Sequence, residues 1–175
     1  EKIMIEKNFQ ESLKWLINTL EEITNGGFDM NMFIITKSLR ADYKNPLSIA
    51  HKVLADRMGE RDPGNKPKSN DRIPFLYVII KEIEKVFDLE NKYKSGKNKG
   101  KPRKKSILQG DRVEHPEYII ENKLDIDYSF YITNQIMKPI LQLLELDNTF
   151  NNSDDKYLFD KYIVNDEKLY KRFNM

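Results

Sequence analysis

Basic side chains are the residues of this chain that are grouped closely enough to act together on a partner. Between Lys92 and Lys105 the sequence KYKSGKNKGKPRKK has eight basic residues and no acidic one. Because ammonium and guanidinium groups attract phosphate and donate hydrogen bonds to it, such a run is typical of a segment that binds nucleic acid or another polyanion. The residues of this run that we predict to contact a polyanion are Lys92, Lys94, Lys97, Lys99, Lys101, Arg103, Lys104 and Lys105.

A second set of basic residues is spread over several segments. Lys37 follows the apolar stretch FIIT, Arg57 falls within a predicted helix, and Arg61 lies in the loop after it. Arg72 and Arg112 each follow an aspartate. Binding of duplex DNA without sequence preference requires donors on several elements, because these donors reach phosphates and groove edges rather than a base code. We therefore predict that these five residues contact DNA.

Other roles for these basic residues remain open. A single lysine is most often a solvated surface charge. Arg72 and Arg112 could instead pair with a nearby carboxylate inside the protein and so fix a turn, and we favour this alternative for Arg112.

A search for catalytic motifs finds none that predicts chemistry in this chain. The sequence has no Walker-type phosphate loop, no G-x-S-x-G and no H-E-x-x-H. Asp125 and Asp127 form a D-x-D pair, but a two-metal site needs a further carboxylate on a neighbouring strand, and this pair lies between two predicted helices. His51 and His115 are isolated, so we expect them to be structural or solvated. We predict no catalytic residue and no metal ligand.

Length and composition set broad limits on the class of protein. The 175 residues, with 39% hydrophobic residues, 33% charged residues and a net charge of +2, fit an ordinary globular chain of one domain or slightly more. No apolar run approaches the length of a membrane span, and the first residues lack the hydrophobic region of a secretory signal. The absence of cysteine excludes disulfides and thiolate zinc sites and is compatible with a reducing compartment.

The hydrophobic pattern of the first half predicts two helices and two strands. Apolar residues between Phe9 and Ile23 recur at helical spacing, and Asn25-Gly26-Gly27 ends this helix. A short strand is expected over 33–36, followed by a helix over 45–58 with Asn45 as its cap and Pro46 in its first turn. Residues 61–71 read as a loop. Residues 72–80 read as a strand that Pro74 restricts to an edge or an end.

The second half is predicted to be mainly helical. The basic run lacks apolar residues, so we expect it to be disordered unless a polyanion orders it. Pro116 opens a short helix. A longer helix starts near Asp127, with a kink or break expected at Pro139 and one apolar face made of Tyr128, Ile132, Ile136, Ile140 and Leu144. A last helix is expected after 153–155, with Leu158, Tyr162, Leu169 and Phe173 as its apolar residues. The predicted fold class is therefore α+β, mainly α, with a few short strands.

Four segments, taken in order, resemble a known family. They read FIITKSLRADYKN, IAHKVLADRM, NDRIPF and GDRVEHPEYIIENKLDIDYSFYITNQIMKPILQLL. In this order they resemble the thumb region near the C-terminal end of family B DNA polymerases, above all the delta-like enzymes and those of large DNA viruses. The resemblance covers roughly residues 8–146, and it leaves a DNA-facing role open for His51, since the family also tends to have histidine in the block IAHKVLADRM. It departs from the family pattern at Asn70, where relatives usually have glycine, and at Glu114-His115, where relatives have an acidic pair.

This resemblance implies a domain layout. Residues 1–32 would form a helix that links the palm to the thumb, residues 33–146 would form the thumb with a basic insertion at about 91–106, and residues 147–175 would form a C-terminal helical tail. The missing cysteines favour a viral-type tail, since eukaryotic relatives carry cysteine-rich modules after the thumb.

The resemblance also implies a function and a set of partners. The thumb would grip primer-template duplex through phosphate and minor-groove contacts, while nucleotide transfer would take place elsewhere in a parent polymerase that uses Mg²⁺. This chain alone would be inactive and would hold no cofactor. The implied partners are double-stranded DNA, the palm and exonuclease domains and a processivity factor, with no membrane, in the nucleus or at a cytoplasmic site of viral replication.

Two functions of other classes remain as alternatives. The chain could be a freestanding adaptor that binds RNA or another polyanion through the basic run alone. It could also be a protein-interaction domain without a nucleic-acid role. Removal of the basic run would abolish binding in the first case and would change nothing in the second.

Overall fold

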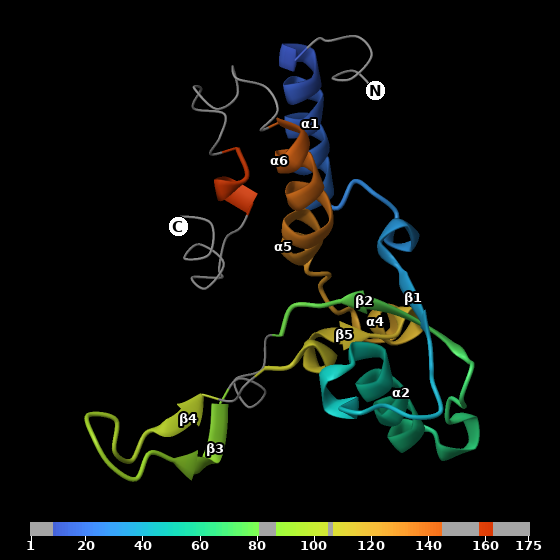
Figure 1. Ribbon diagram of the computed structural model, residues 1–175, viewed down its shortest axis with the longest axis vertical. Coiled ribbons are helices and arrows are strands. Elements are labelled where there is room, and N and C mark those ends of the chain that lie inside the picture. Colours follow the sequence, from blue (N-terminus) through green and yellow to red (C-terminus); the bar gives the residue numbers. More distant parts are fainter. Residues whose placement is uncertain (1–8, 81–86, 105–106, 145–157, 163–175) are drawn as a thin grey trace. The chain divides into compact units, whose positions relative to one another are not determined.

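The computed structural model describes residues 9–80, 87–104, 107–144 and 158–162, and it divides the chain into two compact units. The first unit combines residues 1–33 and 127–175, and the second comprises residues 34–126. Most regular structure in the described residues is helical, with a few short strands (Figure 1). The predicted fold class, α+β and mainly α, is therefore confirmed. No helix among the described residues is long and apolar enough to cross a membrane.

The first unit is built from helices that come from both ends of the chain. Its elements are α1 (Phe9–Thr24), the 3₁₀ turn η1 (Met30–Phe33), α5 (Tyr128–Tyr131), the π-helical η5 (Ile132–Met137), α6 (Lys138–Leu144) and the 3₁₀ turn η7 (Asp160–Tyr162). Helix α1 ends as predicted, because Gly26 adopts a φ of +72°, which a residue with a side chain rarely does. Helix α1 packs against α5 (Figure 1).

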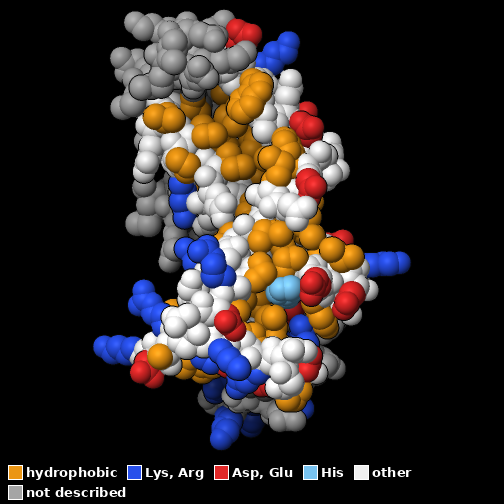
Figure 2. Space-filling model, turned by 90° about the vertical axis from the view of Figure 1, so that its right-hand side faces the viewer, with side chains coloured by type: hydrophobic (Ala, Val, Ile, Leu, Met, Phe, Trp, Pro, Cys, Tyr) orange, Lys and Arg blue, Asp and Glu red, His pale blue; other side chains and the backbone are white. Residues whose placement is uncertain are grey.

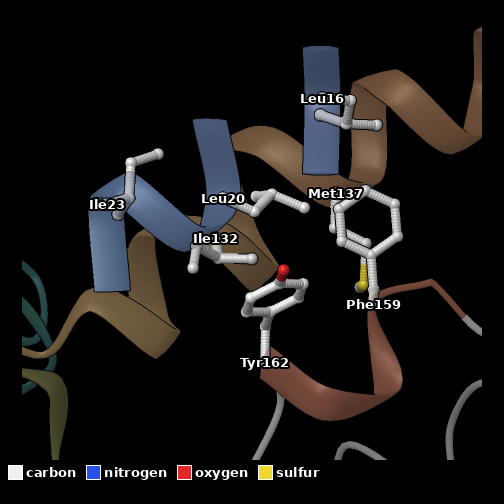
Figure 3. Close-up of a cluster of buried hydrophobic side chains, with 7 residues drawn as sticks. All are labelled: Leu16, Leu20, Ile23, Ile132, Met137, Phe159 and Tyr162. Atoms are coloured by element: carbon white, nitrogen blue, oxygen red, sulfur yellow. The ribbon is translucent and has the colours of Figure 1, made fainter. Parts of the chain in front are cut away.

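Apolar side chains from α1, η5 and the segment 159–162 form the core of this unit. Figure 3 shows the buried members of the cluster, which are Leu16, Leu20, Ile23, Ile132, Met137, Phe159 and Tyr162. Phe33 closes one side, with its ring 5.3 Å from that of Tyr128 and 5.2 Å from that of Tyr131, both edge to face. The core thus depends on contacts between segments about 100 residues apart in the chain, which a periodicity argument does not detect.

The helix that begins after Asp127 continues through Pro139, so the break that we considered does not occur, and the kink stays a prediction. The segment from Tyr128 to Leu144 is helical, and its middle turns, Ile132–Met137, are π-helical. A π turn carries one extra residue, so it can accommodate a proline ring that would clash with the carbonyl four residues earlier in an α-helix. The same extra residue rotates the apolar face. Tyr131, Thr133 and Met137 are consequently buried, although they do not belong to the face predicted from a 3.6-residue period.

The second unit contains a three-stranded antiparallel sheet with helices packed on it. The strands are β1 (Ile35–Ser38), β2 (Arg72–Tyr77) and β5 (Val113–Glu114), in the order β1-β2-β5. Helices α2 (Ala50–Arg61) and α4 (Pro116–Asn122) contact β2 (Figure 1). Three 3₁₀ turns connect these elements, namely η2 (Pro46–Ser48), η3 (Pro63–Asn65) and η4 (Gln109–Arg112). Strand β1 begins two residues later than predicted, because η1 ends at Phe33.

Strand β2 lies in the middle of its sheet, whereas Pro74 led us to expect an edge or an end. Pro74 faces Thr36 of β1, and β5 pairs only with Leu76 and Tyr77. The part of β2 that contains Pro74 therefore has one neighbour. A proline that lacks an N–H is tolerated there because no ladder hydrogen bond is lost on the open side.

The helix predicted over 45–58 is divided in two. Pro46–Ser48 form η2, Ile49 is extended, and α2 starts at Ala50. Asn45 makes no side-chain capping hydrogen bond. The break turns Leu47 outward, where 66% of it is exposed, while Leu54 remains fully buried.

The basic run forms a hairpin rather than the disordered loop that its composition predicted. Strands β3 (Phe87–Lys92) and β4 (Pro102–Lys104) pair antiparallel, with an irregularity between Asp88 and Lys92. Gly96 and Gly100 adopt φ values of +79° and +84°, which lets the chain reverse between the strands. Backbone hydrogen bonds stabilise the hairpin, and composition alone does not reveal them because they need no apolar side chain.

The predicted last helix falls mostly outside the described residues. Among its expected apolar residues, Tyr162 is buried and Leu158 is partly buried, and Leu158 packs against the first-unit core. Leu169 and Phe173, like the expected cap at 153–155, lie outside the described residues.

The close approach of η4 to α2 gives a test of this packing. A Cβ added at Gly110 would lie 2.5 Å from the Cβ of Val53, so Gly110→Ala should destabilise the protein by about 1–3 kcal/mol. Chemical denaturation measures the change. Gly64→Ala is the control, because its Cβ would meet only the Asp62 carboxylate at 3.3 Å, and it should cost much less. Equal stability of the two variants would contradict the packing described.

Candidate nucleic-acid interface

The hairpin presents the densest group of basic side chains in the described structure. Those of Lys92, Lys94, Lys97, Lys99, Lys101 and Arg103 are all exposed. The turn between the strands is held by backbone hydrogen bonds, including Tyr93 N–H to Lys101 O at 3.0 Å and Gly100 N–H to Tyr93 O at 2.9 Å. The Arg103 guanidinium lies over the Tyr93 ring, 5.3 Å from its centroid. The charges are therefore carried on an ordered backbone. The side chain of Lys104 and the whole of Lys105 lie outside the described residues.

Arg57 and Arg61 have partners inside the protein. The Arg57 Nη2 donates to the Gly110 carbonyl at 3.1 Å and to the Val113 carbonyl, and its Nε lies 3.2 Å from Glu114 Oε1. Arg61 forms a bidentate pair with Glu114, at 3.0 and 2.9 Å. Both guanidinium groups thus bind elements of their own unit. This geometry favours a structural role, and the predicted DNA contact of the two residues stays untested.

Glu114 is the centre of this network. It is 7% exposed, accepts two hydrogen bonds from Arg61 and forms an ion pair with Arg57. The Tyr118 ring covers Arg61, with the guanidinium carbon 3.6 Å from the ring centroid. The hydrogen bonds from Arg61 to Glu114 raise the pKa of Arg61 above its usual value. The network joins the C-terminal half of α2 to β5 and α4. The four sequence segments that resemble the family did not indicate that Glu114 is the partner of both arginines.

The remaining predicted residues differ in their surroundings. Lys37 on β1 and Arg72 on β2 are exposed. Arg112 is partly buried, and its charge acts on Tyr77, whose pKa is raised by burial. Figure 2 shows one face of the molecule, on which basic side chains form several groups with acidic side chains between them. Basic donors are thus distributed over separate elements, as we expect for contacts with a phosphate backbone.

In the two Asp-Arg pairs it is the aspartate that fixes a turn. Asp71 Oδ2 accepts the Lys68 N–H at 2.7 Å, and Asp111 Oδ2 accepts the Leu108 N–H at 3.0 Å. We predicted a DNA contact for Arg72 and Arg112, with a carboxylate pair that fixes a turn as the alternative favoured for Arg112, and the DNA contact stays a prediction. Asn70 adopts a φ of +75°, which confirms that it can replace the glycine usual at this turn.

A pocket of about 500 Å³ lies beside Lys37, and the sequence gave no indication of it. Lys37, Arg40, Tyr43 and His51 are among its lining residues. The Tyr43 hydroxyl lies 3.0 Å from His51 Nε2. Burial, followed by the charge of Lys37, lowers the pKa of His51. Arg40 and Tyr43 belong to the segment SLRADYKN, whose sequence resembles the family but gave no indication of a site.

Neither the second histidine nor the D-x-D pair forms part of a metal site in the described residues. His115 Nδ1 lies 3.7 Å from Glu117. Asp127 caps α5, since its carboxylate accepts the Phe130 N–H at 3.0 Å. The residues that the structure describes contain no group of three or more potential metal ligands.

The Glu114 network gives a second test. Glu114→Ala would leave two partly buried cations without a counter-charge, so it should destabilise the protein by about 2–4 kcal/mol. Chemical denaturation again measures the change. Glu117→Ala is the matched control, because this side chain is 84% exposed, and it should cost less than about 0.5 kcal/mol. A loss for Glu114→Ala no larger than that of the control would show that the network does not hold α2 to β5.

Comparison with known proteins supplies the family. The family model described as DNA polymerase family B matches residues 1–146. A DNA polymerase of Acanthamoeba polyphaga mimivirus is 42% identical over 171 residues, 98% of this chain and 9% of that protein. A DNA polymerase of Pyramimonas orientalis virus is 47% identical over 140 residues, 80% of this chain and 10% of that protein.

Cellular relatives are more distant. The DNA polymerase delta catalytic subunit of Glycine max is 31% identical over 147 residues, 82% of this chain and 11% of that protein. The chain thus spans about a tenth of the length of these relatives. The family match extends over the four sequence blocks and most of both structural units. The chain belongs to DNA polymerase family B.

Proposed function

We propose that this chain is the thumb region of a family B DNA polymerase and that it grips the primer-template duplex through the DNA backbone. The observation that carries this proposal is the β3–β4 hairpin. From Lys92 to Arg103 its basic side chains are exposed, and no acidic residue lies among them. Exposed positive charge on an ordered scaffold binds phosphates without reading sequence, which is what a polymerase needs as it moves along DNA.

The binding surface in this proposal differs from the one that the sequence indicated. Arg57 and Arg61 hold Glu114 and stabilise the fold around it. Lys37 and Arg72 remain exposed and available to phosphates. The hairpin and the exposed end of the β1-β2 pair therefore supply the proposed grip, and the two α2 arginines support them indirectly.

The chemistry of the parent enzyme lies outside this chain in our proposal. Nucleotide transfer by two Mg²⁺ ions requires converging carboxylates, which we place in the palm. The palm and exonuclease domains would be the neighbours of this region in the parent chain, and a processivity factor would be a further partner. This assignment is supported by the relatives, which are DNA polymerases of which this chain matches about a tenth.

Salt dependence of DNA binding tests the grip. A fluorescein-labelled 20-base-pair duplex should bind this chain weakly and without sequence preference. The slope of log affinity against log salt should be negative, with an upper limit of about −7 if all eight charges of the run are engaged. Replacing Lys94, Lys97 and Lys99 together by glutamine should make the slope less steep by about 3.

The matched control replaces Lys14, Lys123 and Lys138, which are also exposed, by glutamine. The control should leave the slope nearly unchanged, and neither variant should shift the melting temperature by more than a degree or two, since the altered side chains bury little. A slope near zero for the unaltered chain would exclude duplex binding. Equal slope changes in the two triple variants would exclude the hairpin as the main contact.

A test in the parent polymerase separates grip from chemistry. The same hairpin triple variant in the full-length enzyme should shorten the DNA made per binding event, because a weaker hold raises dissociation. Single-nucleotide incorporation on saturating, pre-bound DNA should fall by less than about threefold, since no altered residue touches the reacting phosphate. A large loss of single-turnover rate with unchanged product length would place the hairpin at the active site and contradict the thumb assignment.

A further inference from the structure

The pocket beside β1 has a lining that carries positive charge and no carboxylate. Its lining residues are Lys37, Ser38, Leu39, Arg40, Tyr43, Ile49, His51 and Asn70. Among the described residues, Lys37 and Arg40 form no ion pair with an acidic side chain. Two cations that lack a counter-ion beside an open hollow favour binding of an anion.

Tyr43 and His51 form a hydrogen-bonded pair in the wall of this pocket. The Tyr43 oxygen accepts the Arg40 backbone N–H at 2.8 Å and lies 3.0 Å from His51 Nε2. When the neutral imidazole carries its proton on Nδ1, Nε2 accepts the Tyr43 O–H, and that hydroxyl proton is not available to a ligand.

We propose that this pocket binds a phosphodiester group of the DNA backbone through Lys37 and Arg40, and that Tyr43 becomes a third donor to the phosphate when His51 takes up a proton. On protonation Nε2–H would donate to the Tyr43 oxygen, so the Tyr43 O–H would be released to the pocket. The inference rests on the proposed function, because it assigns one phosphate contact of the duplex to named residues.

This arrangement links DNA binding to pH. The charged groups that act on His51 are Lys37 of β1 and Arg40 of the following loop, with Tyr43 as the adjacent titratable group, while on α2 itself Lys52 pairs with Asp56. In the free protein burial, followed by the charges of Lys37 and Arg40, lowers the pKa of His51. A bound phosphate would counter both charges and raise that pKa. The complex then holds more protons than the free protein, so affinity should increase as the pH falls through the interval between the two pKa values.

The experiment combines binding measurements with NMR of the histidine rings in this chain. Affinity for a labelled 20-base-pair duplex is measured at several salt concentrations for the Lys37→Gln/Arg40→Gln variant and for a Lys44→Gln/Lys68→Gln control. Lys44 and Lys68 are exposed in the same unit but do not line the pocket. The pocket variant should reduce the steepness of the salt slope by about 2 and the control by much less.

The pH arm uses the unaltered chain, so it does not depend on how a variant folds. Addition of the duplex should raise the pKa of His51, and the ring signals of His115 serve as the internal reference. Affinity should rise between pH 7.5 and 5.5, and this rise should be reduced in His51→Gln and in Tyr43→Phe. Inorganic phosphate, added alone, tests whether a free anion occupies the same pocket.

The outcomes separate this proposal from the function on which it rests. If the duplex binds with a steep salt slope but the pocket variant matches the control and the His51 pKa does not move, the pocket proposal is wrong and the grip by the hairpin stands. If the duplex does not bind while inorganic phosphate raises the His51 pKa, the pocket is an anion site and its assignment to DNA is wrong. If neither ligand affects His51, the pocket binds no phosphate.

Discussion

The buried carboxylate of Glu114 is the constraint on which the second unit depends. A carboxylate removed from water is costly unless charges and donors surround it, and here two guanidinium groups from one helix do so. Arg57 and Arg61 are four residues apart, so both lie on one side of α2 and reach the same short strand. Their interaction holds α2 against β5 and, through Tyr118, against α4. Together with the strand pairing of β1, β2 and β5, this interaction fixes α2 beside the sheet.

The network divides the basic residues of this unit into two groups. Arg57 and Arg61 are satisfied by internal partners, so the fold holds them in place. Lys37, Arg40 and the hairpin lysines are exposed, and a bound phosphate would supply their counter-charge. Because phosphate contacts give affinity without base recognition, a surface of this kind suits a region proposed to hold DNA while another domain performs the chemistry. The hairpin adds to this surface an ordered backbone that a disordered loop would lack, so fewer degrees of freedom are lost on binding.

The first unit depends on a different constraint, because its long helical segment contains Pro139, which lacks a backbone N–H. The helical segment continues through Pro139 by way of the π turn at Ile132–Met137, and Ile132 and Met137 of that turn pack in one core with α1. Helix α1 and η5, which lie near the two ends of the residues that match the family, therefore share a core. This sharing explains why the chain has two units although its sequence blocks follow one another without an obvious boundary.

The sequence by itself determined the features that depend on local chemistry. Four features follow from neighbouring residues alone: the apolar period of α1, its end at glycine, the helix start at Pro116 and the tolerance of Asn70 for positive φ. The sequence also contains the four blocks whose order resembles the family. The tertiary structure alone decided which residues meet across long separations. Glu114 as the partner of Arg57 and Arg61, the pocket that joins Arg40 and Tyr43 to His51, and the pairing of β3 with β4 are examples. The physical reason is that side-chain partnership and backbone pairing depend on three-dimensional proximity, which one-dimensional spacing encodes only within a turn or two of the chain.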